Sequence, residues 1–320
     1  MNLVKRHRFV LMAIAVVLIL PLTVKSPSLA TEVLIFALAA LGCNLLLGYT
    51  GLMSFGQGIF LGLGSYAGGL MLLRLHVPLP MALLTAMAVG ASAALLVGWF
   101  AIRQRGVYFV MLTLAFAQMF YFLAYSLQNL TGGDNGLLNI PRPQVTVFGT
   151  LLFPTATPWQ YYALVALIFV AVFALLQRIV NSVFGRTLLA IRDNEVRAAA
   201  IGYDIKSFKL IAFMISGAVT GLAGALYAMM TGIAPLSSIE YHASELILIM
   251  TVIGGTGNLF ASVLGAAFYI LFGDWLSSLW PRWLMLLGIL LIAVSLAMQK
   301  GLWGLIEQIG RRLRPAEKQP

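Results

Sequence analysis

Long apolar segments recur along the whole chain and are separated by short breaks that contain Pro, Gly or charged residues. A helix needs about 20 mostly apolar residues to cross a bilayer. Ten segments approach that length, the eighth being short: residues 9–24, 32–48, 52–73, 80–102, 107–127, 160–178, 210–231, 244–256, 258–274 and 282–299. The pattern predicts an all-α, polytopic transmembrane bundle of about ten spans, forming one domain over residues 1–320.

Composition excludes a soluble globular domain. Hydrophobic residues make up 61% of the chain and charged residues only 9%, whereas a soluble domain carries about 25% charged residues. The N-terminal segment admits two interpretations. Lys5, Arg6 and Arg8 precede an apolar stretch, and residues 28–30 (Ser-Leu-Ala) resemble a signal-peptide cleavage site. We expect a retained first span instead, because the topology then closes better.

The distribution of Lys and Arg predicts the orientation in the membrane. With the N-terminus in the cytoplasm, 16 of the 20 basic residues lie in inside segments and 4 lie outside. The inside residues are Lys5, Arg6, Arg8, Arg103, Arg105, Arg178, Arg186, Arg192, Arg197, Lys206, Lys209, Lys300, Arg311, Arg312, Arg314 and Lys318, and the outside residues are Lys25, Arg74, Arg142 and Arg282. Cytoplasmic loops of membrane proteins carry this excess. The net charge of +10 is therefore a topology signal and does not indicate nucleic acid.

Chemistry that would drive transport or catalysis is missing from the sequence. There is no P-loop motif, no charged residue in the middle of a span, and no nucleophile beside a base. Three scattered His do not form a metal site, and Cys43 lies in an apolar run. We therefore expect no cofactor, no metal and no enzymatic activity. A transporter whose energy comes from another subunit fits this chain better than one that couples transport to an ion gradient by itself.

A glycine-rich stretch, GYTGLMSFGQGIFLGLGSYAGG, occupies residues 48–69. Its small residues are consistent with tight helix packing or with a helix that lines a substrate path. Ser54 and Gln57 at its start, with Thr113 and Gln118 of the fifth span, are the candidate path residues. Thr113 and Gln118 do not share one helix stripe. A similar Gly-Thr-Gly turn at residues 254–273 indicates either a two-half pseudo-repeat or chance in a Gly-rich chain.

The charged segment 178–209 is expected to be a cytoplasmic loop. Its stretch RTLLAIRDNEVRAAA favours a short amphipathic helix that ends at Gly202. Leu188, Ile191 and Glu195 share one side, which Ala198 and Ala199 continue. The helix could lie on anionic lipid or enter a groove on a partner protein.

Five stretches resemble one family of transport proteins. They are GYTGLMSFGQGIFLGLGSYAGG, RQRGVYFVMLTLAFAQMF, LTGGDNGL, FGRTLLAIRDNEVRAAAIGYDIKSFKLIAFMISGAVTGLAGALYA and LIMTVIGGTGNLFASVLGAA, covering most of residues 45–270. The chain resembles the LivM-like permeases of bacterial ABC importers for branched-chain amino acids. Urea and short-chain amide permeases are similar, so the resemblance leaves urea and small amides as alternative substrates.

The resemblance implies a permease of the inner membrane with both termini in the cytoplasm. It implies a second, related permease, two cytoplasmic ATPase subunits and a periplasmic substrate-binding protein that faces the outside loop 128–159. The loop 178–209 would couple to an ATPase through Arg186, Arg192, Glu195, Arg197, Ala198, Ala199 and Gly202. The general importer signature is E-A-A-x-x-x-G. Here Glu195 lies one residue too far from Gly202 and no Ala-Ala follows it, so the individual contacts depart from the pattern.

Two other classes of function remain open. One is a self-sufficient secondary carrier or channel, since ion sites can be built from backbone carbonyls at broken helices. The other is a membrane enzyme, against which the missing catalytic pair argues. We expect alternating access driven by the ATPases.

Overall fold

The computed structural model describes residues 3–24, 26–142, 145–147, 150–153, 157–297 and 301–304. Ten long helices carry the fold: α1 (Leu3–Thr23), α2 (Pro27–Thr50), α3 (Gln57–Arg74), α4 (Leu79–Ala101), α5 (Val107–Ser126), α7 (Pro158–Val180), α10 (Ile205–Thr231), α11 (Tyr241–Gly254), α12 (Leu259–Leu279) and α13 (Trp283–Ala297). The short elements are α6 (Gln128–Thr131), η1 (Gly133–Asn135), β1 (Val145–Val147), β2 (Thr150–Phe153), α8 (Val183–Asp193), α9 (Glu195–Ala200) and η2 (Leu236–Ser238).

Each of the ten predicted ranges coincides with one of the long helices. Six of them, α2, α4, α5, α7, α10 and α12, are long and apolar enough to cross a membrane. The chain is thus a multi-pass helical membrane protein. The eighth range is short as expected, since α11 has 14 residues and spans only about 21 Å at 1.5 Å per residue.

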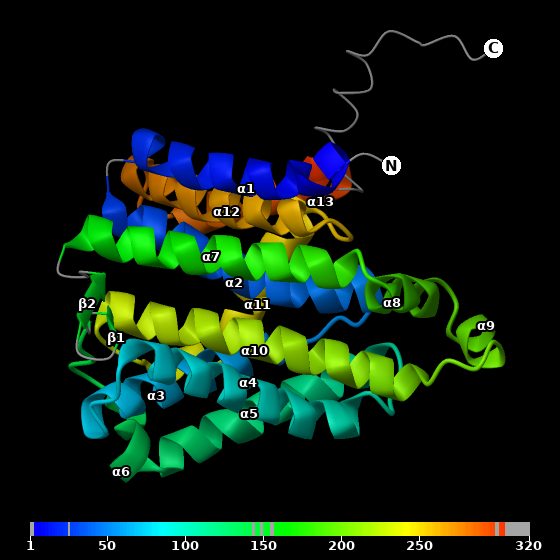
Figure 1. Ribbon diagram of the computed structural model, residues 1–320, viewed down its shortest axis with the longest axis horizontal. Coiled ribbons are helices and arrows are strands. Elements are labelled where there is room, and N and C mark those ends of the chain that lie inside the picture. The colour runs from blue at the N-terminus through cyan, green and yellow to red at the C-terminus, as the bar shows by residue number, and fades with distance from the viewer. Residues whose placement is uncertain are drawn as a thin grey trace, which may run out of the picture.

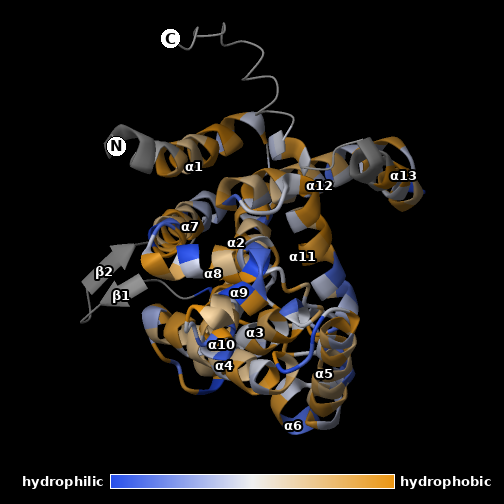
Figure 2. Cartoon of the chain, turned by 90° about the vertical axis from the view of Figure 1, so that its right-hand side faces the viewer, coloured by the Kyte–Doolittle hydropathy of each residue, from blue (hydrophilic) through white to orange (hydrophobic). Residues whose placement is uncertain are grey.

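The helices lie side by side along the long axis of the molecule (Figure 1). The predicted outside loop, with α6 and the β1–β2 hairpin, lies at one end of the bundle, and α8 and α9 lie at the other. Viewed from that second end, α9 lies near the centre of the end face (Figure 2). The loops 128–159 and 178–209 therefore occupy opposite ends, as the charge pattern predicted. Lys25 and the basic residues from Lys300 to Lys318 lie outside the described residues.

Helices α2 and α10 form the centre of the bundle. Most side chains of α2 are buried, and α10 packs against α2, α3 and α4. Close approach depends on glycine: a Cβ at Gly64 would lie 2.1 Å from the Gly221 oxygen, and one at Gly90 would lie 2.3 Å from the Gly217 oxygen. Small residues let the backbones of membrane helices touch. Close packing therefore accounts for Gly64 of the glycine-rich third span.

Several predicted helix boundaries are wrong. The third helix begins at Gln57 and not at residue 52, because Gly51 (φ 73°) ends α2 and residues 51–56 are not helical. Helix α10 begins at Ile205 within the predicted loop. The outside loop contains the short antiparallel β1–β2 hairpin, an addition to an otherwise helical fold that the sequence did not predict. Strand pairing satisfies backbone groups that a segment of few helix-forming residues leaves open.

The helix α1 packs against the bundle along one side. Ala13, Val17 and Leu20 are buried, and the Tyr162 hydroxyl of α7 donates to the Val17 carbonyl at 2.6 Å. The predicted first span is thus a helix in contact with the other helices.

Candidate functional site

A non-helical segment, residues 51–56, enters the bundle between α2 and α3. Ser54 is buried, whereas Met53 is 40% exposed. The Gly56 amide donates to the Ser54 hydroxyl (3.1 Å), and the Phe55 amide donates to the Thr113 hydroxyl of α5 (3.1 Å). Irregular backbone at membrane depth is tolerated only where it is buried in protein or lines a cavity. The two hydroxyls therefore replace the helical partners that this segment lacks.

Gln57, the first residue of α3, is fully buried and uses its whole amide group within the protein. Its Nε2 donates to the Ser216 hydroxyl (3.0 Å), and its Oε1 accepts from the Thr220 hydroxyl (2.9 Å). Ser216 in turn donates to the Gly42 carbonyl of α2 at 2.7 Å. Gly42 lies eight residues before the end of α2, about 12 Å at 1.5 Å per residue. The N-terminus of α3 is therefore inside the bundle.

The structure brings Ser54, Gln57 and Thr113 into one buried region. Gln118 is half-buried on α5 and makes no hydrogen bond to this region among the described residues. The sequence prediction missed the partners on α10 and α11. Ser216 and Thr220 are four residues apart on one face of α10, a spacing that could have identified them; Ser244, which accepts from the Gly58 amide (2.7 Å), carries no such signal.

A second irregular turn lies beside the end of α2. The Asn44 amide nitrogen donates to the Asn258 carbonyl (2.8 Å) and the Ser262 hydroxyl (2.6 Å), and its oxygen accepts from the Gly257 amide (3.2 Å). A Cβ at Gly48 would lie 2.5 Å from the Gly257 nitrogen. The two Gly-containing turns that resemble each other in sequence are thus packed against one another, although the pseudo-repeat itself stays a prediction.

The predicted helix over RTLLAIRDNEVRAAA is broken at Asn194. Asn194 has extended backbone (φ −161°, ψ 101°) and its side chain accepts from the Arg197 amide at 2.9 Å, so it caps α9. Asn is among the best N-cap residues, and this local bond competes with helix continuation. Gly202 (φ 97°) ends α9 as predicted. Two short helices therefore project at an angle from the bundle.

Ionic contacts attach α9 to the bundle. The Lys209 ammonium of α10, whose side chain is 4% exposed, pairs with Glu195. Arg105, between α4 and α5, pairs with the same carboxylate at 3.4 Å. Nothing in the sequence pattern indicates this pairing, since Lys209 stands at the end of the predicted loop. The Glu195 carboxylate therefore has ion-pair partners within this chain.

Helix α8 is attached through Arg192. Its Nη1 donates to the Gly48 carbonyl near the end of α2 at 2.5 Å, and its Nη2 pairs with Asp193 at 3.2 Å. The last carbonyls of a helix have no partner within the helix, and Arg can supply one. Arg192 therefore links α8 to the turn from which residues 51–56 continue.

The remaining predicted coupling residues differ in exposure. Arg186, Arg197, Ala199 and Gly202 are exposed, whereas Ala198 is buried. Two apolar side chains that the sequence analysis did not single out, Val196 and Ile201, are each 72% exposed at the tip of α9. Both lie beside the exposed Arg197 at the end of the bundle, although residues five apart do not share one helix stripe.

The sequence matches a protein-family model described as branched-chain amino acid transport system / permease component, over residues 27–295. The chain belongs to this family. The match includes residues 51–56, both short helices α8 and α9, eight of the ten long helices in full and most of α13.

Individual permeases with curated names are similar to this one. The high-affinity branched-chain amino acid transport system permease protein LivM of Salmonella typhimurium is 29% identical, over 93% of this chain and 75% of that protein. LivM of Escherichia coli K12 is 30% identical, over 86% of this chain and 69% of that protein. The autoinducer 2 import system permease protein LsrC of Photorhabdus luminescens is 30% identical over 32% of each chain. No solved structure matches the permease.

Proposed function

We propose that this chain is the membrane-spanning permease subunit of an ATP-driven importer for branched-chain or related amino acids. The observation that carries the proposal is the family match over residues 27–295, with LivM proteins similar over most of the chain. The permease would lie in a bacterial inner membrane with both termini in the cytoplasm and about ten crossings. It would pair with a second permease, two ATPase subunits and a periplasmic binding protein. It would itself catalyse no covalent reaction.

The tip of α9 is the surface proposed to contact an ATPase. Val196 and Ile201 are exposed apolar side chains at the basic end of the bundle, and Arg197 beside them is exposed. Exposed apolar groups rimmed by charge favour a protein contact. Glu195 and Arg192 are proposed to support this surface without contacting the ATPase. Their bonds to Lys209 and Gly48 attach the two short helices to α10 and α2.

Residues 51–56 and the start of α3 are proposed to border the translocation path. Broken helices in transporters present backbone groups to substrate and change shape with access. Here Ser54 and Thr113 hold the irregular segment and Gln57 ties it to α10. Gln118 would belong to the path only in another conformation. Alternating access would follow when ATPase motion, received by α9, shifts the helices around this segment.

Substitution of Val196 tests the coupling surface. In the assembled complex, Val196→Asp should lower substrate-stimulated ATP hydrolysis about thirtyfold, because a carboxylate buried at the contact costs on the order of 2 kcal/mol. Val107→Asp is the matched control, since Val107 is 66% exposed at the same end of the bundle, at the start of α5. Equal hydrolysis in both variants, with normal membrane insertion, would remove α9 from the coupling role.

Reconstitution tests the energy source and the substrate. Vesicles that contain the whole complex should accumulate leucine, isoleucine or valine only with ATP inside and binding protein outside. Uptake by this chain alone under an ion gradient would contradict the proposal in favour of a secondary carrier. Uptake of urea or acetamide in place of the amino acids would keep the mechanism and reassign the substrate.

A further inference from the structure

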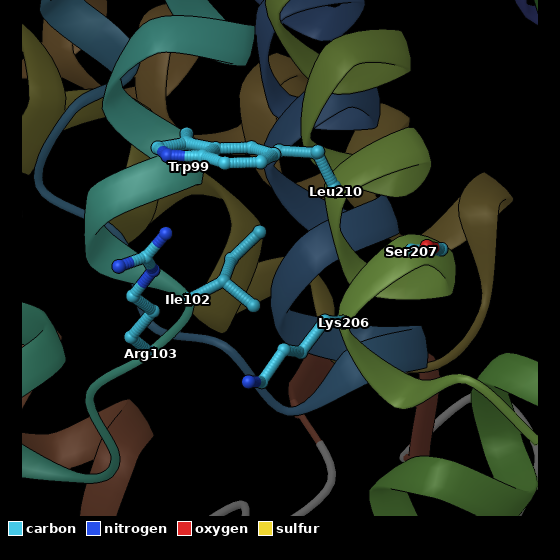
Figure 3. Close-up of a pocket in the computed structure, with 7 residues that line it drawn as sticks. Trp99, Ile102, Arg103, Lys206, Ser207 and Leu210 are labelled. Atoms are coloured by element: carbon cyan, nitrogen blue, oxygen red, sulfur yellow. The ribbon is translucent and has the colours of Figure 1, made fainter.

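A cleft of about 400 Å³ opens between the end of α4 and the start of α10. Trp99, Ile102 and Arg103 line it from α4 and the residues that follow, and Lys206 and Leu210 line it from α10. Figure 3 shows Trp99 and Leu210 at one level of the cleft, with Arg103 and Lys206 below them and coming from opposite sides. The cleft therefore has an apolar half and a cationic half.

The cationic half is arranged before any ligand arrives. The Arg103 guanidinium lies 5.3 Å from the Trp99 ring centroid, a cation–π distance. Lys206 comes from the other helix and is exposed. Two basic residues that line one cleft from different segments are suited to a single anionic ligand.

The charges around the cleft leave an excess of positive charge. Glu195 is paired with both Lys209 and Arg105. Asp204 accepts from the Ser207 hydroxyl (2.6 Å) and amide (3.5 Å), and these bonds lower the pKa of Asp204, so it stays ionised. Together with Arg103 and Lys206, these residues comprise four cations and two carboxylates. A negatively charged group is favoured over a neutral one.

The apolar half continues into an exposed hydrophobic surface. Leu95, Leu96 and Phe100 of α4 are 40%, 46% and 52% exposed, and Ile211 of α10 is 46% exposed. Trp99 itself is 56% exposed, and Trp is enriched where a membrane meets water. The cleft thus lies at the boundary between a face suited to hydrocarbon and the basic end of the bundle. A water-soluble anion would contact only the cationic half of the cleft.

We propose that this cleft binds the phosphodiester headgroup of an anionic phospholipid. Arg103 and Lys206 contact the phosphate oxygens, the Trp99 ring lies against the glycerol region, and the acyl chains follow the exposed side of α4. Basic pockets between helices on the cytoplasmic side of a membrane bind anionic lipid headgroups. The site rests on the membrane location of the bundle and is independent of what the permease transports.

Lipid titration of the purified full-length permease, followed by native mass spectrometry, tests the site. Phosphatidylglycerol should bind more tightly than phosphatidylcholine with the same acyl chains. Arg103→Gln and Lys206→Gln should each weaken phosphatidylglycerol binding about fivefold, since one basic residue near a membrane surface contributes roughly that factor. Arg178→Gln, which removes an exposed cation at the end of α7 away from the cleft, is the matched control and should change binding less than twofold. Arg103→Lys should recover most of the affinity.

Three results would overturn the proposal. The first is equal weakening in Arg178→Gln, which would show a diffuse charge effect. The second is displacement of phosphatidylglycerol by millimolar inorganic phosphate, which would assign the cleft to free phosphate. The third is that Arg103→Gln and Lys206→Gln bind lipid as the wild type does but lose ATPase subunits from the complex. The cleft would then be a contact with another protein.

Discussion

The buried pair between Glu195 and Lys209 gives the sharpest test of how α9 is held. Glu195→Gln removes the partner of an ammonium whose side chain is 4% exposed. The remaining contact of that ammonium would be a neutral amide. Arg105, whose side chain is 74% exposed, also loses its ion pair but can be solvated instead. The substitution should therefore act mainly through Lys209.

The size of the effect follows from burial on each side of the pair. Removing one partner of a fully buried ion pair costs about 3–5 kcal/mol. Because the Glu195 side chain is 27% exposed, water screens the pair, and we expect about 2 kcal/mol for detachment of α9. Lys209→Met should cost less, because Glu195 keeps Arg105 and solvent. The double variant Glu195→Gln/Lys209→Met should resemble Lys209→Met and not the sum of the two.

Hydrogen–deuterium exchange measures this detachment directly. The amides of Ala198 and Ile201 donate to the carbonyls of Asn194 and Arg197, so their exchange reports the opening of α9. A loss of about 2 kcal/mol predicts roughly thirtyfold faster exchange in Glu195→Gln, with the core of α2 unchanged. Wild-type exchange in Glu195→Gln, or additive losses in the double variant, would refute the idea that this pair holds α9.

Two further predictions concern packing and capping. Gly224→Ala places a Cβ 1.9 Å from the Leu61 oxygen and should destabilise the permease by about 2 kcal/mol, seen as a lower thermal midpoint in detergent. Gly288→Ala, which meets nothing within 4 Å, is its control, and equal midpoints would contradict the close approach. Asn194→Ala should speed exchange in α9 about fivefold through loss of the N-cap, whereas Asn194→Asp should not. Equal exchange in both variants would exclude the cap.

The sequence predicted the ten long helices because each required only a long apolar run between breakers, a local property. It did not predict the break at Asn194, since the surrounding residues are good helix formers and one side-chain bond decides the local geometry. It placed the start of α3 too early for a related reason. Residues 52–56 are apolar enough to be helical, but the turn at Gly51 and the bonds to the hydroxyls of Thr113 and Ser54 favour a non-helical path.

The candidate site could be predicted only in part, because its contacts join distant parts of the chain. Gln57 and Thr113 were identifiable as polar groups in apolar spans. Their partners were not, since the bond from Gln57 to Ser216 crosses 159 positions of sequence. The pairing of Glu195 with Lys209 crosses a turn whose geometry depends on where α9 ends and α10 begins. The sequence predicted the residue types and the packing determined their partners.

The buried polar groups around the start of α3 explain how this bundle contains irregular backbone without fixed charges. Ser54 and Thr113 are neutral hydroxyls that satisfy the amides of residues 55 and 56. A hydroxyl can rotate to a new partner when the backbone moves, whereas a buried ion pair that separates leaves a costly unpaired charge. The ionic contacts in turn lie at the end of the bundle, where Glu195 and Arg192 attach α9 and α8. Rigid attachment at the end and exchangeable hydrogen bonds inside are the combination required if a push on α9 is to move the segment 51–56.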